Sequence, residues 1–244
     1  AASLAAAGYD RCSTASNHAF DYGVDGVTQT IDALEQHGLG WSGTARTPEE
    51  ASEPRVFDVG GVRVAHLSAT YGLNGLRLPD AAPWLVTPLD VDALLAQAAA
   101  ARAAGAEIVV VSAHCCAEYR VDPTAPQQEQ FRALIQSPDV DLVIGHHAHV
   151  VQPIERVGDE YIVYGLGNIL SNMYASTCCP AASQDGVVVE TTFTEGPDGR
   201  FRVDEVLYTP TWVDRRGGHV VTPVADALRE EQDPRRRAEL EASW

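Results

Sequence analysis

Apolar residues recur along the chain with two different spacings, one typical of helices and one typical of strands. Helical spacing predicts three long helices, over 23–39, 88–105 and 124–138. Gly38 and Gly105 lie near the ends of the first two, where glycine commonly stops a helix. Alternating or continuous apolar runs predict strands over 9–15, 107–114 and 140–147, and a hairpin over 55–69 around Gly60-Gly61. The second and third of these strands are apolar throughout, which indicates burial on both faces.

After residue 150 the pattern changes to shorter apolar runs separated by Gly and Asp turns. It predicts four successive strands, over 151–157, 161–167, 186–195 and 201–208. A charged helical tail follows at about 222–244, and we expect it to pack on the outside or to fray. Strands that alternate with helices predict one α/β domain over 1–244. Its partly parallel, buried sheet would continue into antiparallel strands and carry helices on its faces.

The composition narrows the function classes. The chain has 244 residues and is 45% hydrophobic, which is enough for one sizeable core. Its net charge is −17, and all 17 basic residues are Arg. Because proteins bind a polyphosphate backbone by neutralising its charge, so acidic a chain without an Arg-rich stripe is a poor nucleic-acid binder. An anionic substrate would need a local cation to offset the repulsion.

Polar side chains suited to metal binding or proton transfer follow three of the predicted strands. Asn17 and His18 follow the first, His114 ends the second, and His147 and His149 follow the third. In sheets of this kind, ligands bind beyond the carboxyl ends of the strands. If the three strands are neighbours, these side chains meet at one edge of the sheet. This convergence is the main functional signal in the sequence.

His147 and His149 are two residues apart, so in an extended segment they point the same way and can face one metal cluster. Imidazole is a common ligand of Zn, Fe and similar ions. A lone His-x-His pair is weak evidence, since many histidines only form hydrogen bonds. Together with His114 and Asn17, the pair predicts a metal site, to which Asn17 offers an amide oxygen. His18 is well placed as a general acid.

Two loops allow two interpretations each. The loop with Tyr71 and Asn74 is either a substrate loop or a turn rich in Asn and Gly. Asn168 either presents a polar side chain to the site or follows a glycine bulge.

The cysteines indicate neither a thiolate nucleophile nor a zinc knuckle. The order His-Cys…Arg from His114 to Arg120 is similar to the phosphate loop of cysteine phosphatases. However, four residues rather than five separate Cys115 from Arg120, and Glu118 would repel phosphate. The vicinal pairs 115–116 and 178–179 lack CxxC spacing. They are compatible with one disulfide between the pairs in an exported protein, or with reduced, partly buried thiols.

Five motifs in order resemble the bacterial capsule-synthesis family of the CapA type, named for poly-γ-glutamate capsules. They are SNHAFDYG (16–23), SATYGLNG (68–75), VSAHCCAEY (111–119), IGHHAHVVQPIE (144–155) and YGLGNILSN (164–172). The resemblance covers about residues 1–195. It implies the fold of calcineurin-like metallophosphoesterases, a four-layer α/β/β/α sandwich with a di-metal centre at the strand ends.

The resemblance also implies roles for individual residues. Asn17, His114, His147 and His149 would be metal ligands, and His146 occupies a variable position. His18 would protonate a leaving group. Glu118 and Tyr119 would contact substrate, and we place Tyr71, Asn74 and Asn168 with them as candidate substrate-binding residues. One or two divalent ions are implied, with Mn, Fe or Zn as candidates.

The sequence departs from the family pattern in two places. The family's first strand, with Gly-Asp carboxylate ligands, has no counterpart here, so we expect it upstream of residue 1. Without it, the second ion would keep little beyond His149. Cys115 and Cys116 also stand where the family often has an aromatic residue and a glycine.

Three functions remain in competition. The first is a metal-dependent hydrolase-like protein of capsule or cell-envelope polymer metabolism, acting on a phosphoester or an anionic polymer. The second is a non-catalytic protein that binds or helps to export the polymer, with an incomplete metal site. The third is an unrelated α/β domain that binds a small ligand. The resemblance implies a place outside the cytoplasm, near membrane-associated capsule machinery, with a membrane or lipid anchor in an upstream segment.

Overall fold

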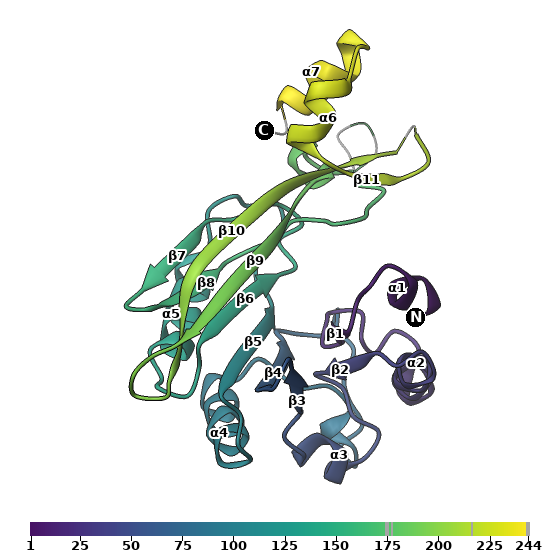
Figure 1. Cartoon of the computed structure of the whole chain (residues 1–244). Helices are drawn as coiled ribbons and strands as arrows, with labels where there is room; N and C mark the ends of the chain where they lie inside the picture. The colour runs from purple at the N-terminus through teal and green to yellow at the C-terminus, as the bar shows by residue number, and fades with distance from the viewer. Residues whose placement is uncertain (174–175, 177, 216, 243–244) are drawn as a thin grey trace. The chain divides into compact units, whose positions relative to one another are not determined.

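The computed structural model describes residues 1–173, 176, 178–215 and 217–242. Contacts between Cα atoms group the chain into two compact units. The first comprises Ala1–Cys115 and Gln130–Val143, and the second comprises Cys116–Glu129 and Ile144–Trp244. Helix α5 (Ala125–Ile135) and strand β6 (Leu142–His146) run from one unit into the other. Both units mix helices and strands, so the predicted α/β class is confirmed (Figure 1).

The first unit begins with a short helix and then alternates strands with helices. Its elements before α5 are α1 (Ala2–Ala6), β1 (Arg11–Ser13), α2 (Gly23–Gln36), β2 (Gly40–Ser42), α3 (Pro48–Ser52), β3 (Val56–Val59), β4 (Val62–Thr70), η1 (Pro83–Leu85), α4 (Val91–Ala103) and β5 (Ile108–His114). Strands β1 and β2 pair in parallel, as do β4 and β5, while β3 and β4 form an antiparallel hairpin.

Local sequence explains where these elements start and stop. The two-residue turn between β3 and β4 needs a positive φ at both positions, and Gly60 (61°) and Gly61 (95°) supply it. Helix α4 starts at Asp90, whose carboxylate accepts a hydrogen bond from the Ala93 amide at 2.9 Å. The helix ends before Gly105, whose φ of 91° is a conformation that glycine adopts readily at the end of a helix.

The core strands of this unit carry the predicted site residues at their ends. All but one residue of β5 are buried, as an apolar strand covered on both faces requires. Its last residue, His114, is in register with Thr70 at the end of β4. The backbone amide of Tyr71 donates to the His114 carbonyl at 2.9 Å, so the loop after β4 begins beside His114.

The second unit is largely antiparallel. After β6 its elements are β7 (Ile154–Val157), β8 (Glu160–Val163), η2 (Ala181–Gln184), β9 (Asp185–Glu195), β10 (Phe201–Asp214), β11 (Val220–Pro223), α6 (Val224–Glu230) and α7 (Pro234–Ala242). Strand β7 pairs with β8, and β10 pairs with both β9 and β11. The four predicted strands are present, although β10 is six residues longer than 201–208 and β11 was not predicted.

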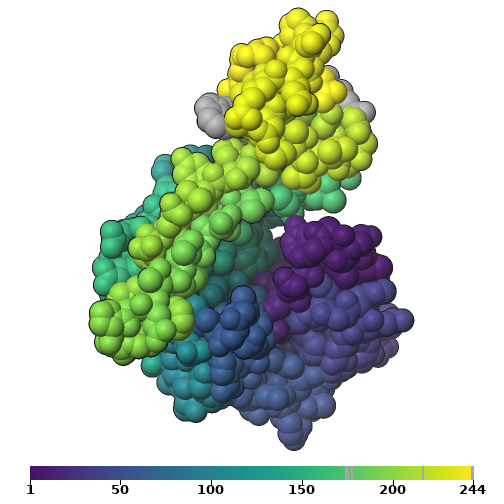
Figure 2. All heavy atoms as spheres, viewed as in Figure 1, coloured from purple at the N-terminus to yellow at the C-terminus, as the bar shows by residue number. Residues whose placement is uncertain are grey.

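The charged tail packs rather than frays. It forms β11 and two short helices, which Figures 1 and 2 show in yellow beside the end of β10. Val224 and Leu240 bury their side chains against Trp212, with 0%, 1% and 3% exposed. Arg236 forms an ion pair with the buried carboxylate of Asp214, which ties α7 to β10. A few apolar residues in a charged sequence therefore anchor the tail.

The expectation of a single domain over 1–244 stays a prediction beside the two contact units. Among the described helices, none combines the length and apolar character needed to cross a bilayer.

Candidate metal centre

The sequence places five site residues after strand ends, and the structure divides them between the two units. Asn17, His18 and His114 belong to the first unit. His147 and His149 belong to the second. Each group is a cluster of interacting side chains. That all five join at one edge stays a prediction.

In the first unit, Asn17 is the centre of a chain of polar side chains. Its Oδ1 accepts a hydrogen bond from Nε2 of His114 at 3.0 Å, and its Nδ2 donates to Oδ1 of Asn74 at 3.1 Å. Asn17 and His114 are buried, with 7% and 9% of their surfaces exposed. The loop after β4 thus supplies Asn74 to this cluster, and its turn geometry, with a φ of 52° at Asn74, serves that placement.

His18 lies beside this cluster but is exposed, with 68% of its side chain open to solvent. Its Nδ1 lies 2.7 Å from Oδ2 of Asp21 and 3.4 Å from Nδ2 of Asn74. One nitrogen cannot donate to the first and accept from the second at once. The shorter contact, to a carboxylate that can only accept, shows that Nδ1 carries the hydrogen, and Nε2 has no part in either contact. His18 also lines an open cleft of about 940 Å³.

Sequence reasoning missed Asp21. The spacing of three residues from His18 across a turn was the available signal, because such a carboxylate can orient an imidazole. The pair is the arrangement in which a carboxylate holds one ring nitrogen while the other handles a proton.

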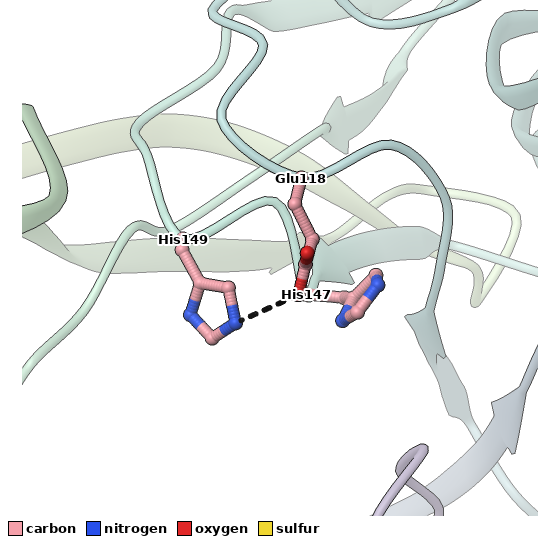
Figure 3. A group of neighbouring side chains, drawn as sticks. All are labelled: Glu118, His147 and His149. Atoms are coloured by element: carbon pink, nitrogen blue, oxygen red, sulfur yellow. Dashed lines mark ion pairs between the residues drawn. The ribbon is translucent and has the colours of Figure 1, made fainter. Parts of the chain in front are cut away.

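In the second unit, three side chains could hold a metal ion together: Glu118, His147 and His149. One ligand atom from each lies within 4.8 Å of the other two. Oε1 of Glu118 is 3.5 Å from Nε2 of His149, and the two imidazole rings are 5.8 Å apart. Figure 3 shows the Glu118 carboxylate between the two rings. Within the described residues this is the one such group of three.

The donors and their spacing fit a divalent transition metal. Two imidazoles and one carboxylate are typical ligands of Zn, Fe and Mn. With metal–ligand bonds of about 2.1 Å, two ligands of a tetrahedral ion lie about 3.4 Å apart. The Glu118–His149 separation of 3.5 Å matches that value. His147 offers its ring nitrogen within 4.8 Å of the other two ligand atoms.

The backbone that presents these residues is not extended, which corrects one prediction. His147 and His149 have φ values of 96° and 58°, so the alternation of an extended strand does not apply. They face one centre because the chain coils after β6. Tyr119, at a φ of 61°, donates its amide to the Ala148 carbonyl at 2.7 Å and so links the two loops.

Tyr119 covers His149. Their rings stack with centroids 5.8 Å apart and planes 25° apart, and the Tyr119 hydroxyl is 3.5 Å from Sγ of Cys179. Burial raises the pKa of the Tyr119 phenol, and the Glu118 carboxylate adds to the effect. The phenol therefore stays protonated at neutral pH.

His146 lies outside the group of three. Loss of solvent around its ring, with the neighbouring charge of His147, lowers the pKa of His146 to about 4. His146 is therefore neutral at physiological pH.

The remaining candidates differ in their surroundings. Asn168 places its side chain on His149, with Oδ1 3.0 Å from Nδ1. Tyr71 is 49% exposed, at the start of the loop that carries Asn74. Glu118, expected to contact substrate, is also one of the three possible metal ligands, and its substrate contact stays a prediction.

The cysteines form neither of the arrangements expected. Cys178 and Cys179 are joined to each other, so they do not bridge to the other pair and are not free thiols. Cys115 and Cys116 are also disulfide-bonded, and Cys12 is free. A thiolate nucleophile at Cys115 is therefore excluded by its bonding as well as by its spacing.

The chain is similar in sequence to bacterial capsule-synthesis proteins. The family model "Bacterial capsule synthesis protein PGA_cap" matches residues 1–173. The PGA biosynthesis protein CapA of Bacillus subtilis (strain 168) is 30% identical over 195 residues, covering 79% of this chain and 49% of that protein. The capsule biosynthesis protein CapA of Bacillus anthracis is 31% identical over 168 residues, covering 67% of this chain and 40% of that protein. The chain thus spans about half the length of these relatives or less.

A solved structure shows the same fold. The calcineurin-like phosphoesterase YfkN from Bacillus subtilis superposes with a TM-score of 0.54 over 98% of this chain and 73% of that one. Its sequence identity is 15%, so the likeness concerns the fold alone. The predicted metallophosphoesterase fold is confirmed.

Proposed function

The chain belongs to the bacterial capsule synthesis protein family, and we propose that it is a metal-dependent hydrolase-like protein that makes or processes an anionic capsule polymer. The observation that carries the proposal is the group of Glu118, His147 and His149. Three protein ligands leave coordination positions open, which is typical of catalytic rather than structural metal sites.

The bound ion would activate a water molecule and stabilise charge on a phosphoryl or carbonyl oxygen. Glu118, His147 and His149 would hold the ion, and the stacked ring of Tyr119 keeps the His149 ring in place. Asn17 and His114 are the candidate ligands of the first unit, since their oxygen and nitrogen are already oriented toward each other in a buried site.

His18 is the candidate general acid. Its Nδ1 is held by Asp21, so its exposed Nε2 can give a proton to a leaving group that enters the cleft. Asp21 stabilises the protonated His18 ring before substrate binds, and it fixes the orientation of the ring after the proton has been transferred.

The proposed substrate is an anionic polymer of the poly-γ-glutamate type or a phosphoester. The names of the relatives, in PGA and capsule biosynthesis, support the polymer. A net charge of −17 would repel such a substrate. A divalent cation at the site would supply local attraction for such a substrate.

The proposal includes a location outside the cytoplasm, beside membrane-associated capsule machinery. The disulfides support it, because they persist mainly in oxidising compartments. Non-reducing mass spectrometry of the protein isolated from its native host tests this point. Fully reduced cysteines there would contradict an extracytoplasmic location.

One observation favours the second candidate, a non-catalytic protein that binds or helps to export the polymer. Asn17 and His114 form a direct hydrogen bond, so each already has a partner without an ion. A site completed in this way can be structural.

The experiment loads the purified chain separately with Mn²⁺, Fe²⁺ and Zn²⁺ and measures bound metal by mass spectrometry. Hydrolysis of bis(p-nitrophenyl) phosphate and of poly-γ-glutamate is then measured. We expect roughly one ion per chain at the three-residue group. The double variant His147→Ala/His149→Ala should lose metal and activity, and His18→Ala should lose activity alone. His37→Ala, an exposed histidine at a helix end, is the matched control.

The outcomes separate the candidates. Metal content unchanged in the double variant overturns the site. Activity unchanged in His18→Ala overturns the role of His18. Metal and polymer binding without hydrolysis in any metal form supports the non-catalytic candidate.

A further inference from the structure

Asn168 contacts His149 through both ends of its side-chain amide. Its Oδ1 is 3.0 Å from His149 Nδ1, and its Nδ2 lies 2.9 Å from the Ser183 carbonyl oxygen and 3.4 Å from the His149 carbonyl oxygen. Both ends of the amide are thus engaged within the protein. The side chain is directed at the back of the ring, on the opposite nitrogen from Glu118.

These contacts determine which way the amide faces. Carbonyl oxygens only accept hydrogen bonds, so the atom beside Ser183 and the His149 carbonyl must be the NH₂ donor. The oxygen then faces Nδ1. Because an amide oxygen only accepts, Nδ1 must carry a hydrogen whether the ring is neutral or protonated.

The backbone holds Asn168 in this position. Its amide donates to the Asp185 carbonyl at 3.1 Å, next to an antiparallel bridge between Gly167 and Gly186. Gly167 has a φ of 68°, and a Cβ there would lie 2.4 Å from the Asp185 oxygen. Gly167 and Gly186 therefore let the chain approach β9 closely enough to place Asn168 at His149, which explains the glycine directly before Asn168.

We propose that Asn168 is the positioning residue that fixes His149 as its Nδ1–H tautomer and so makes Nε2 the metal-binding nitrogen. This inference rests on the proposed function for its consequence, metal binding, but not for the tautomer itself. With Nδ1 protonated, the free lone pair of the neutral ring is on Nε2, the nitrogen that lies 3.5 Å from Glu118 Oε1. Asn168 fixes the edge of the ring, and the stacked Tyr119 fixes its plane. Residues that orient ligand histidines in this way commonly change metal affinity about 10- to 100-fold.

Histidine nitrogen NMR on the metal-free chain tests the tautomer directly. We expect the Nδ1–H form for His149 in the wild type at mildly alkaline pH, with the signal assigned by its loss in His149→Ala. Asn168→Leu should shift His149 toward the Nε2–H form that prevails in free imidazole side chains. Asn168→Asp keeps an acceptor at the same place and should keep the Nδ1–H form.

The matched control uses another Asn–His pair of the same unit. Asn172 Oδ1 lies 2.5 Å from Nε2 of His219, and neither residue belongs to the metal group. Asn172→Leu should leave the His149 signals unchanged. A Zn²⁺ titration of each folded variant should show about 10- to 100-fold weaker binding for Asn168→Leu and wild-type binding for Asn172→Leu.

The two readouts fail separately. An Nε2–H tautomer in the wild type, or an unchanged tautomer in Asn168→Leu, overturns the inference whatever the metal result. An Nδ1–H tautomer in a wild-type chain that binds no metal overturns the proposed metal site while the assignment of Asn168 stands. If Asn168→Leu does not fold, the wild-type tautomer still decides.

Discussion

Replacing Glu118 by Gln is the sharpest test of the three-residue group, because it changes charge and little else. The amide has nearly the shape of the carboxylate. The Glu118 side chain is 43% exposed, so water can still hydrate the amide that replaces the carboxylate. The backbone anchor beside it, from the Tyr119 amide to Ala148, is unaffected. A change in metal affinity therefore reports on the carboxylate itself.

The expected size follows from Coulomb's law. A single negative charge about 2.1 Å from a divalent ion contributes about 4 kcal/mol even at the dielectric constant of water, which corresponds to about 700-fold in affinity. The partial exposure of Glu118 justifies that low limit rather than a value for a dry interior. An amide oxygen keeps part of the attraction through its dipole. We therefore expect Glu118→Gln to bind Zn²⁺ about 100-fold more weakly than the wild type.

The measurement is a competition titration against a chromogenic chelator at physiological salt. Glu190→Gln, an exposed glutamate on β9 of the same unit, removes the same charge away from the site. It should bind Zn²⁺ within a factor of about two of the wild type, since salt screens distant surface charges. Equal affinities in Glu118→Gln and the wild type would refute Glu118 as a ligand. Equal losses in both variants would show a general effect of net charge instead.

Three further predictions concern other parts of the molecule. Asp21→Asn should lower hydrolysis about 10- to 100-fold at unchanged metal content, since an amide no longer stabilises the protonated His18; full activity would contradict the pairing. Burial raises the pKa of the Cys12 thiol, so the rate at which iodoacetamide alkylates it in the folded protein should still rise at a pH where the rate for an ordinary thiol has levelled off. Without reductant, mass spectrometry should detect alkylation at Cys12 alone, because the other four cysteines are disulfide-bonded. Leu240→Ala should destabilise the packing of α7 by about 2–3 kcal/mol, the low end for such a change, because the apolar cluster around Leu240 is small. Hydrogen exchange in α7 of the variant that is as slow as in the wild type would contradict this prediction.

The elements that could be predicted from sequence are those that local chemistry specifies. The Gly60-Gly61 hairpin and the Asp90 cap follow from single residues with one preferred conformation. The buried strand β5 follows from a continuous apolar run. The packing of the tail could not be predicted, because it depends on three apolar residues brought together from β10, α6 and α7 across a highly charged sequence.

The candidate site shows the same division. Residue types and strand ends were sufficient to propose His114, His147 and His149 as site residues, but not the side chains that surround them in their clusters. Glu118 joins the two histidines only because Tyr119 hydrogen-bonds across to Ala148, a contact between loops that no spacing encodes. Asn168 reaches His149 through a close approach of two backbones, of which the sequence shows the glycines but not the target.

The backbone conformation of the site is itself an argument for function. Five described residues other than glycine have positive φ, and four of them lie in the two clusters: Asn74, Tyr119, His147 and His149. Each such residue costs about 1–2 kcal/mol relative to the right-handed regions. Glycine at these positions would remove the cost, yet it would also remove the side chain that makes the cluster. Since the fold retains four unfavourable conformations around donor groups, the placement of those groups, rather than the stability of the loops, accounts for the residues found there.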